Sequence, residues 1–441
     1  MLGALALLAG AMAALLVGGE EKDAGEGRRA GERALSPAQR AQLEAAAPGL
    51  SARPGRALPT SPAVRATLAR LSLERQVAQL FVAGFDGQYP RDPGFKALRR
   101  RGWGGVMLSS ANFVDETQLT DLTGEIRVVA RKAGHLAPIV AADQPGGPDS
   151  AFPDLPPRAQ PLVGDSSSPA IARSQARKAS AALRERGIRM TLAPVADVGT
   201  AAGPLQDRVF SDDPAVVSAM TAQAVGAYRR GGVISAVGHF PGAGGASENP
   251  DFATASVGLS LPELRKRDLR PFAAIAGRTP VIVVSNAVYA AYDGATPAVE
   301  LPEVVGGLLR RELGFRGVVM TDDLADTALV TGENVGSAAV AALRAGSDLL
   351  YVSGGPAQER AYRAVLAAVR KGTISRERLR ISVTRVLTLK QRYGLLPTPR
   401  RRTRPRGRAR PRPRPPAQSR TRPPAPATTP ATPTTPATRA R

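Results

Sequence analysis

The chain has 441 residues, 43% of them hydrophobic, which is enough for one large domain with extensions or for two ordinary domains. It contains no cysteine, so disulfides, thiolate metal sites and a cysteine nucleophile are excluded. With only two histidines, His135 and His239, a catalytic zinc site is not expected, and we predict chemistry that needs neither metal nor cofactor.

The N-terminal segment is an apolar run from Leu2 to Gly18, made of Leu, Ala, Val and Met with small residues between them. Its length lies between that of a signal-peptide core and that of a minimal membrane span. We interpret residues 1–18 as a signal peptide or membrane anchor, with a buried helix as the alternative. Residues 19–60, charged and rich in Ala, Gly and Arg, are predicted to be a flexible spacer.

Apolar strands alternate with amphipathic helices from Leu71 onward. An eightfold alternation over about 280 residues is typical of a (β/α)8 barrel rather than a doubly wound sheet, and we predict one such barrel in residues 61–396. The expected strands are Val77–Phe85, Gly104–Leu108, Pro138–Ala142, Met190–Val198, Val233–Val237, Val281–Val284, Gly317–Met320 and Asp348–Val352. The expected helices include Glu116–Lys132, Pro169–Arg186, Pro214–Arg230, Pro262–Ala276, Pro302–Leu313 and Ser375–Tyr393.

Polar residues stand at the ends of these predicted strands, namely Asp143, Asp197, His239, Asn286 and Asp322. Barrel enzymes carry their chemistry at the carboxyl ends of the strands. Five such coincidences favour a catalytic face.

The C-terminal segment, residues 397–441, is rich in Arg, Pro and Thr and is predicted to be a disordered tail. Thirteen arginines and no acidic residue lie between Arg400 and Arg441, so about +10 of the +23 net charge remains for the rest of the chain. The tail could bind an anionic polymer such as teichoic acid or nucleic acid by charge alone, and no specific nucleic-acid partner is expected.

Six segments occur in the same order as motifs of a known family. They are L-S-L-E-R-Q-V-A-Q-L-F-V-A-G at 71–84, A-D-Q-P-G-G at 142–147, L-A-P-V-A-D-V at 192–198, D-R-V-F-S-D-D-P at 207–214, H-F-P-G at 239–242 and R-R-E-L-G-F-R-G-V-V-M-T-D-D-L at 310–324. The chain from about Leu71 to Tyr393 therefore resembles the N-terminal barrel domain of family 3 glycoside hydrolases, specifically its β-N-acetylhexosaminidase branch.

The resemblance implies a nucleophile. The first Asp of the family's T-D-D pattern carries over onto Asp322, whose carboxylate would attack an anomeric carbon and form a covalent glycosyl-enzyme. Water would open this intermediate with net retention of configuration. Asp323 is expected to cap the following turn.

The resemblance also implies three sugar-binding residues. Asp143 matches an Asp that accepts hydrogen bonds from ring hydroxyls, Arg208 an Arg that reaches the sugar, and His239 the His of a Lys-His pair. The alternatives are a turn residue for Asp143, a salt-bridge partner for Arg208 and a hydrogen-bonded core residue for His239.

Departures from the family pattern fall in the same site. Gly238 replaces the Lys before the His, and Pro145 replaces the Glu of D-Q-E-G-G. The family's Asp-x-His acid/base pair aligns with Asn249 and Asp251, so the general-acid His is absent. Asp251 is the predicted replacement, with Glu248 as a neighbour that could substitute; the alternative is that both are solvated loop charges.

The resemblance implies a retaining glycosidase that cleaves β-N-acetylhexosaminides, and with the N-terminal segment we expect it to act on a cell-wall glycan outside the cytoplasm. It would be secreted, or held to the membrane if its N-terminal segment is uncleaved. The alternative is a catalytically impaired family member that binds cell-wall glycan, and a third possibility makes the basic tail the working part.

Overall fold

The computed structural model describes residues 60–199, 203–205 and 207–396. The predicted anchor, the predicted tail and all but the last residue of the predicted spacer lie outside the described residues. Among the described residues, no helix is both long and apolar enough to cross a bilayer.

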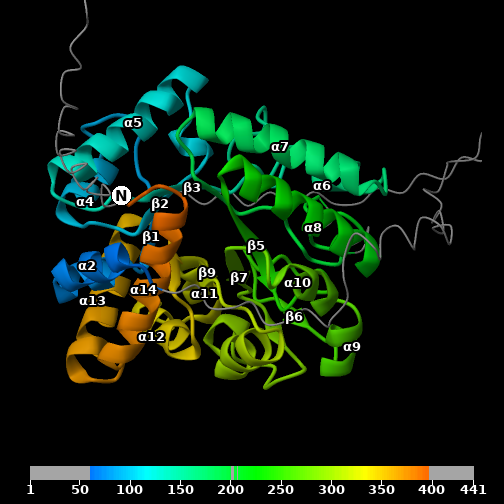
Figure 1. Ribbon diagram of the computed structural model, residues 1–441. Helices are drawn as coiled ribbons and strands as arrows, with labels where there is room; N and C mark the ends of the chain where they lie inside the picture. The colour runs from blue at the N-terminus through cyan, green and yellow to red at the C-terminus, as the bar shows by residue number, and fades with distance from the viewer. Residues whose placement is uncertain (1–59, 200–202, 206, 397–441) are drawn as a thin grey trace, which may run out of the picture. The chain divides into compact units, whose positions relative to one another are not determined.

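Eight parallel strands form the barrel, and helices surround it (Figure 1). The strands are β1 (Phe81–Gly84), β2 (Gly105–Leu108), β3 (Ile139–Ala142), β4 (Met190–Thr191), β5 (Ile234–Phe240), β7 (Val281–Val284), β9 (Val318–Asp323) and β10 (Leu349–Val352). They close in the order β1-β10-β9-β7-β5-β4-β3-β2. The predicted (β/α)8 barrel is therefore confirmed. Two short strands, β6 (Ser256–Val257) and β8 (Val288–Tyr289), pair beside it.

Two predicted strands are too long. Residues 77 and 78 end helix α3 (Leu73–Ala78), which begins because the Ser72 side chain accepts a hydrogen bond from the Arg75 amide. The segment predicted as a strand from Met190 pairs regularly only to Thr191. Pro194, which has no N–H to donate, follows soon after, and beyond it only Val195 makes an isolated bridge to β5.

Five of the predicted helices agree closely with the structure. These are α5 (Glu116–Lys132), α7 (Pro169–Glu185), α8 (Pro214–Gly231) and α14 (Arg376–Arg392), together with a π-helical segment, η3 (Glu303–Glu312). The structure has further helices, α2 (Pro62–Arg70), α4 (Pro93–Arg100), α6 (Gln160–Gly164), α11 (Leu324–Thr331), α12 (Val335–Ala345) and α13 (Gly355–Lys371), with short 3-10 turns at Ser110–Asn112 and Ala298–Glu300.

The helix predicted over 262–276 is wrong as a single element. The structure has α9 (Leu261–Lys266) and α10 (Leu269–Ile275) instead. Pro271 cannot donate a backbone hydrogen bond, so it is tolerated only in the first turn of a helix, and a new helix begins just before it.

Helix α14 covers the amino ends of the strands. Its residues Val386, Leu389 and Tyr393 pack on the apolar side chains inside the barrel. The buried Lys390 donates to Gln79, just before β1, at 2.7 Å (Nζ to Oε1). The opposite, carboxyl end of the barrel is left for the polar strand ends.

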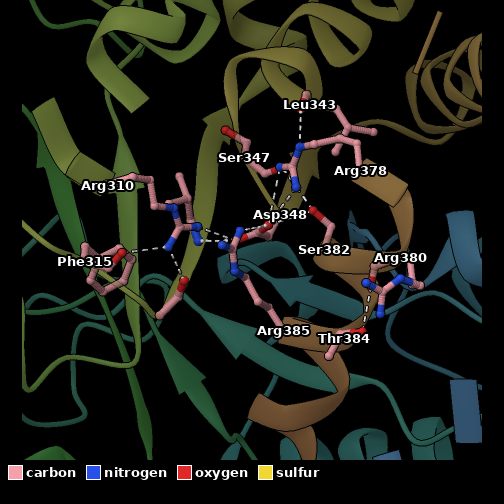
Figure 2. Close-up of polar contacts among 12 residues, drawn as sticks. Arg310, Phe315, Leu343, Ser347, Asp348, Arg378, Arg380, Ser382, Thr384 and Arg385 are labelled. Carbon is pink, nitrogen blue, oxygen red and sulfur yellow. Dashed lines mark hydrogen bonds and ion pairs between the residues drawn. The ribbon is translucent and has the colours of Figure 1, made fainter. Parts of the chain in front are cut away.

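A buried carboxylate, Asp348, joins η3, β10 and α14 (Figure 2). Its oxygens accept from Arg310 at 2.6 Å, from Ser382 at 2.7 Å and from Arg385 at 3.0 Å, and Arg378 lies at 3.4 Å. Burial opposes ionisation of Asp348, but the three guanidinium groups hold its pKa below the ordinary value. The network therefore ties together segments that are far apart in the sequence.

Candidate active site

The predicted site residues converge at the carboxyl end of the barrel. His239 lies in β5 and Asp322 in β9, and the His239 Nε2 atom is 3.7 Å from Asp322 Oδ2. Asp143, directly after β3, is half-buried; burial raises its pKa to about 7, and the charges that act on it are those of Arg208, Asp251, His239 and Asp322. The structure thus brings all five side chains into one site, although their roles remain a prediction.

Asp197 fixes the imidazole of His239. Its fully buried carboxylate lies 2.7 Å from His239 Nδ1 and also accepts from the Ala243 amide at 2.7 Å. Burial of His239 opposes its protonation, but Asp197 and Asp322 outweigh this effect and raise its pKa to about 9. At neutral pH the ring is therefore an imidazolium that donates from Nδ1 to Asp197 and presents Nε2 to Asp322.

Asp322 and Asp323 have different environments. Burial raises the pKa of Asp322 to about 6, and His239 limits the rise. The Asp323 carboxylate accepts from the amides of Ala325 at 2.9 Å and Ser353 at 3.0 Å, so it caps α11, as predicted. Of these two neighbouring residues, therefore, Asp322 is the one whose carboxylate faces the site.

Arg208 links the two loops that cover the site. The guanidinium is buried and lies 2.9 Å from Asp251 Oδ2 and 3.3 Å from Asn249 Oδ1 (both from Nη2), and 3.6 Å from Asp149 (Nε to Oδ2). Burial alone would lower the pKa of Arg208, but Asp251 and the other neighbouring carboxylates raise it. Glu248 is exposed and has no ion-pair partner in the part of the chain that the structure describes, so the loop brings Asp251, not Glu248, to the site.

The loop after β3 owes its shape to Gln144. The buried Gln144 side chain donates to the carbonyls of Phe152 at 2.8 Å and Leu155 at 3.0 Å, and it accepts from the Phe152 amide at 3.0 Å. These three bonds hold the turn on which Asp143 stands. Pro145, at the position of the family's Glu, supplies no charge to the site.

Glycines in the loop after β5 serve close packing. Gly242 has a φ of +128°, and a Cβ there would lie 2.5 Å from the Asp268 Cβ atom. A Cβ on Gly244 would lie 2.1 Å from the Val198 carbonyl oxygen. The glycines therefore let the loop lie against the barrel beside His239.

One further carboxyl group, Asp326, faces this region and was not predicted. It lies in the first turn of α11, is half-buried, and has its pKa raised to about 7, chiefly by burial and then by Asp323, Asp251 and Asp322. A usable signal was present in the sequence: position 326 is four residues after Asp322, in a helix that begins directly after the strand.

No group of three or more His, Asp or Glu side chains within the described ranges is arranged to hold a metal ion. The described site consists of buried carboxyl groups, an imidazolium and a guanidinium at the carboxyl end of a (β/α)8 barrel. Several carboxyl groups in one site at the end of a barrel are typical of glycosidases, most of which use a pair of carboxyl groups.

Comparison with known proteins agrees with this class. The model of the glycosyl hydrolase family 3 N terminal domain matches residues 72–389, and the chain belongs to this family. The predicted family and the prediction of a glycosidase are therefore confirmed.

Three similar proteins illustrate the relationship. An uncharacterized secreted glycosyl hydrolase of Arthroderma benhamiae is 32% identical over 343 residues, which cover 75% of this chain and 96% of that protein. A β-hexosaminidase of Stenotrophomonas maltophilia is 34% identical over 257 residues, 56% of this chain and 75% of that protein. The structure of a family 3 β-N-acetylglucosaminidase from a Paenibacillus species superimposes with a TM-score of 0.69 at 31% identity, over 74% of this chain and 63% of that one.

Proposed function

We propose that this protein hydrolyses β-N-acetylhexosaminides with retention of configuration, and that Asp322 is the nucleophile. The observation that carries the proposal is the chain of contacts from Asp197 through the His239 imidazolium to Asp322. It holds an attacking carboxylate at the end of β9 beside a fixed positive charge. The names of the similar hexosaminidase and N-acetylglucosaminidase support an N-acetylhexosamine as the sugar that is released.

The reaction proceeds in two displacements. In the first, an oxygen of Asp322 bonds to the anomeric carbon while the bond from this carbon to the leaving oxygen breaks, and a general acid gives that oxygen its proton. In the second, the conjugate base takes a proton from water, whose oxygen displaces Asp322 from the anomeric carbon. Asp143, Arg208 and His239 bind the sugar hydroxyls in this scheme.

Asp251 is the proposed general acid, as its alignment with the family's acid/base position predicts. Its carboxylate lies at the site but is paired with Arg208 at 2.9 Å. A carboxylate in such a pair must leave the guanidinium before it can carry a proton. Asp326 is the second candidate, because its raised pKa of about 7 keeps it protonated over part of the neutral range without such a rearrangement.

The proposed substrate is a glycan outside the cytoplasm, such as that of the cell wall. The description of the Arthroderma relative as secreted supports this location. The alternative, a protein that binds the glycan without cleaving it, draws on the losses at Gly238 and Pro145 and of the general-acid His.

Hydrolysis of a panel of aryl β-glycosides, N-acetylglucosaminide included, by the full chain tests the proposal. Asp322→Asn is expected to lower kcat/KM at least about a thousandfold, because amides are poor nucleophiles. Asp121→Asn, an exposed position on α5, is the matched control and should retain activity. The anomer released first, measured by NMR, should be β. Glycan binding without turnover on any sugar would show a binding protein instead.

A further inference from the structure

A cavity lies at the amino end of the barrel, away from the site described above. Its volume is about 820 Å³. The segments just before β7 and β9, one face of α14 and the last turn of α8 line it. Six of the lining residues are arginines and none is acidic; we call this cavity the arginine pocket, defined by Arg229, Arg278, Arg316, Arg380, Arg385 and Arg392.

The fold places these arginines together. Strands β7 and β9 are paired with Val281 opposite Val318, so Arg278 and Arg316 precede neighbouring strands at the same edge. Along α14, Arg380 and Arg392 stand at the two ends of a row of lining residues spaced four apart, with Arg385 beside the row. Figure 2 shows Arg380 and Arg385 on this helix.

Among the residues that the structure describes, only two of the six guanidinium groups have a carboxylate partner. Arg385 is paired with Asp348 at 3.0 Å, and Arg380 with Glu377 at 2.7 Å. The other four have no carboxylate partner within the described ranges; they are Arg229, Arg278, Arg316 and Arg392. Unpaired like charges around one cavity repel one another, so the site favours an anion that neutralises several of them.

We propose that the arginine pocket binds an anion that carries two or more phosphate groups. Guanidinium groups form paired hydrogen bonds with phosphate oxygens. A single carboxylate would neutralise one of four positive charges, whereas a linked phosphate ligand brings several negative charges at once. The cavity volume of about 820 Å³ is within the range of small-molecule sites. The proposal does not depend on the proposed hydrolysis.

Isothermal titration calorimetry of the full chain in about 0.15 M salt measures the affinity for pyrophosphate and for tripolyphosphate and so tests this site. The double variant Arg278→Gln with Arg316→Gln should bind tripolyphosphate at least about tenfold more weakly, because each substitution removes a guanidinium group and its charge-assisted hydrogen bonds with phosphate. The matched control, Arg401→Gln with Arg402→Gln, removes the same charge from the C-terminal tail and should change binding less than about twofold. If the double variant unfolds at a lower temperature than the wild type, Arg229→Gln alone repeats the test, and it too should weaken tripolyphosphate binding.

Three results would overturn the assignment. Equal weakening in the tail control would show attraction by net charge rather than a site. Citrate binding as tightly as tripolyphosphate would show that phosphate is not recognised. Absence of binding to the wild-type chain would show that the arginine pocket takes no such anion. Aryl glycoside hydrolysis should be the same in all these variants, because the pocket lies at the other end of the barrel.

Discussion

Two opposing effects set the pKa of the proposed nucleophile, Asp322. Burial raises the pKa of Asp322 to about 6, while the imidazolium of His239, 3.7 Å away, favours the charged carboxylate. A nucleophilic carboxylate must be deprotonated. We therefore expect kcat/KM of the wild-type chain to fall about tenfold per pH unit below an apparent pKa near 6.

Substitution of His239 by Gln tests this coupling. The change removes a positive charge beside Asp322, so the carboxyl group should hold its proton more tightly. The acidic limb of the kcat/KM profile is then expected to move upward by about one pH unit. The matched control is His135→Gln, in the segment that precedes β3, where the Nε2 atom contacts the Arg99 carbonyl. An acidic limb that stays in place in His239→Gln would mean that the imidazole does not act on the nucleophile.

Two elements offer a carboxyl group for proton transfer, the loop after β5 with Asp251 and helix α11 with Asp326. The general acid matters most when the leaving group is poor, because that oxygen needs a proton as its bond breaks. Asp251→Asn is expected to slow a poor leaving group about a hundredfold and an activated dinitrophenyl glycoside much less. The rates of hydrolysis of both substrates are also measured for Asp326→Asn, so that the two variants can be compared. The same pattern in Asp326→Asn, with Asp251→Asn unaffected, would transfer the role to α11.

The Asp348 network is a stability feature that joins three elements. Asp348→Asn leaves Arg310, Arg378 and Arg385 without their buried counter-charge, and such a loss costs about 3 to 5 kcal/mol. Urea unfolding at pH 7 measures it. Glu377→Gln, in the exposed pair with Arg380, is the control and should cost much less, because solvent screens an exposed ion pair. Equal costs would contradict the assignment.

The same network predicts how the free energy of unfolding changes with pH. The pKa of Asp348 is lower in the folded than in the unfolded chain, where it is near 3.9. The stabilisation is therefore fully present above about pH 4 to 5 and is lost as the pH falls through the folded-state pKa. The difference between wild type and Asp348→Asn should accordingly shrink in acid.

At the scale of the whole molecule, the barrel was predictable because its buried strands are short apolar runs with helical patterns between them. Local exceptions came from single residues: the Ser72 cap converts the start of one predicted strand into helix, and Pro271 divides a predicted helix. Asp143, His239 and Asp322 were predicted from their places at strand ends, which the topology brings together, whereas Arg208 and Asp251 came from the resemblance to the family motifs. The pairing of Arg208 with Asp251 and the arginine pocket could not be predicted, because both join loops or elements whose relative positions the sequence does not define.

The distribution of charge over the chain leads to the last prediction. Thirteen of the arginines lie in residues 400–441, so a chain that ends at Pro399 keeps about +10 of the +23 net charge. Attraction to a polyanion depends on the number of cations that displace its counterions, so binding to polyglutamate should weaken and the salt dependence should become shallower. Hydrolysis of a soluble aryl glycoside should stay within about twofold, because an uncharged substrate is not attracted by the positive charge of the tail. Polyglutamate binding unchanged by the deletion would instead assign the attraction to the barrel.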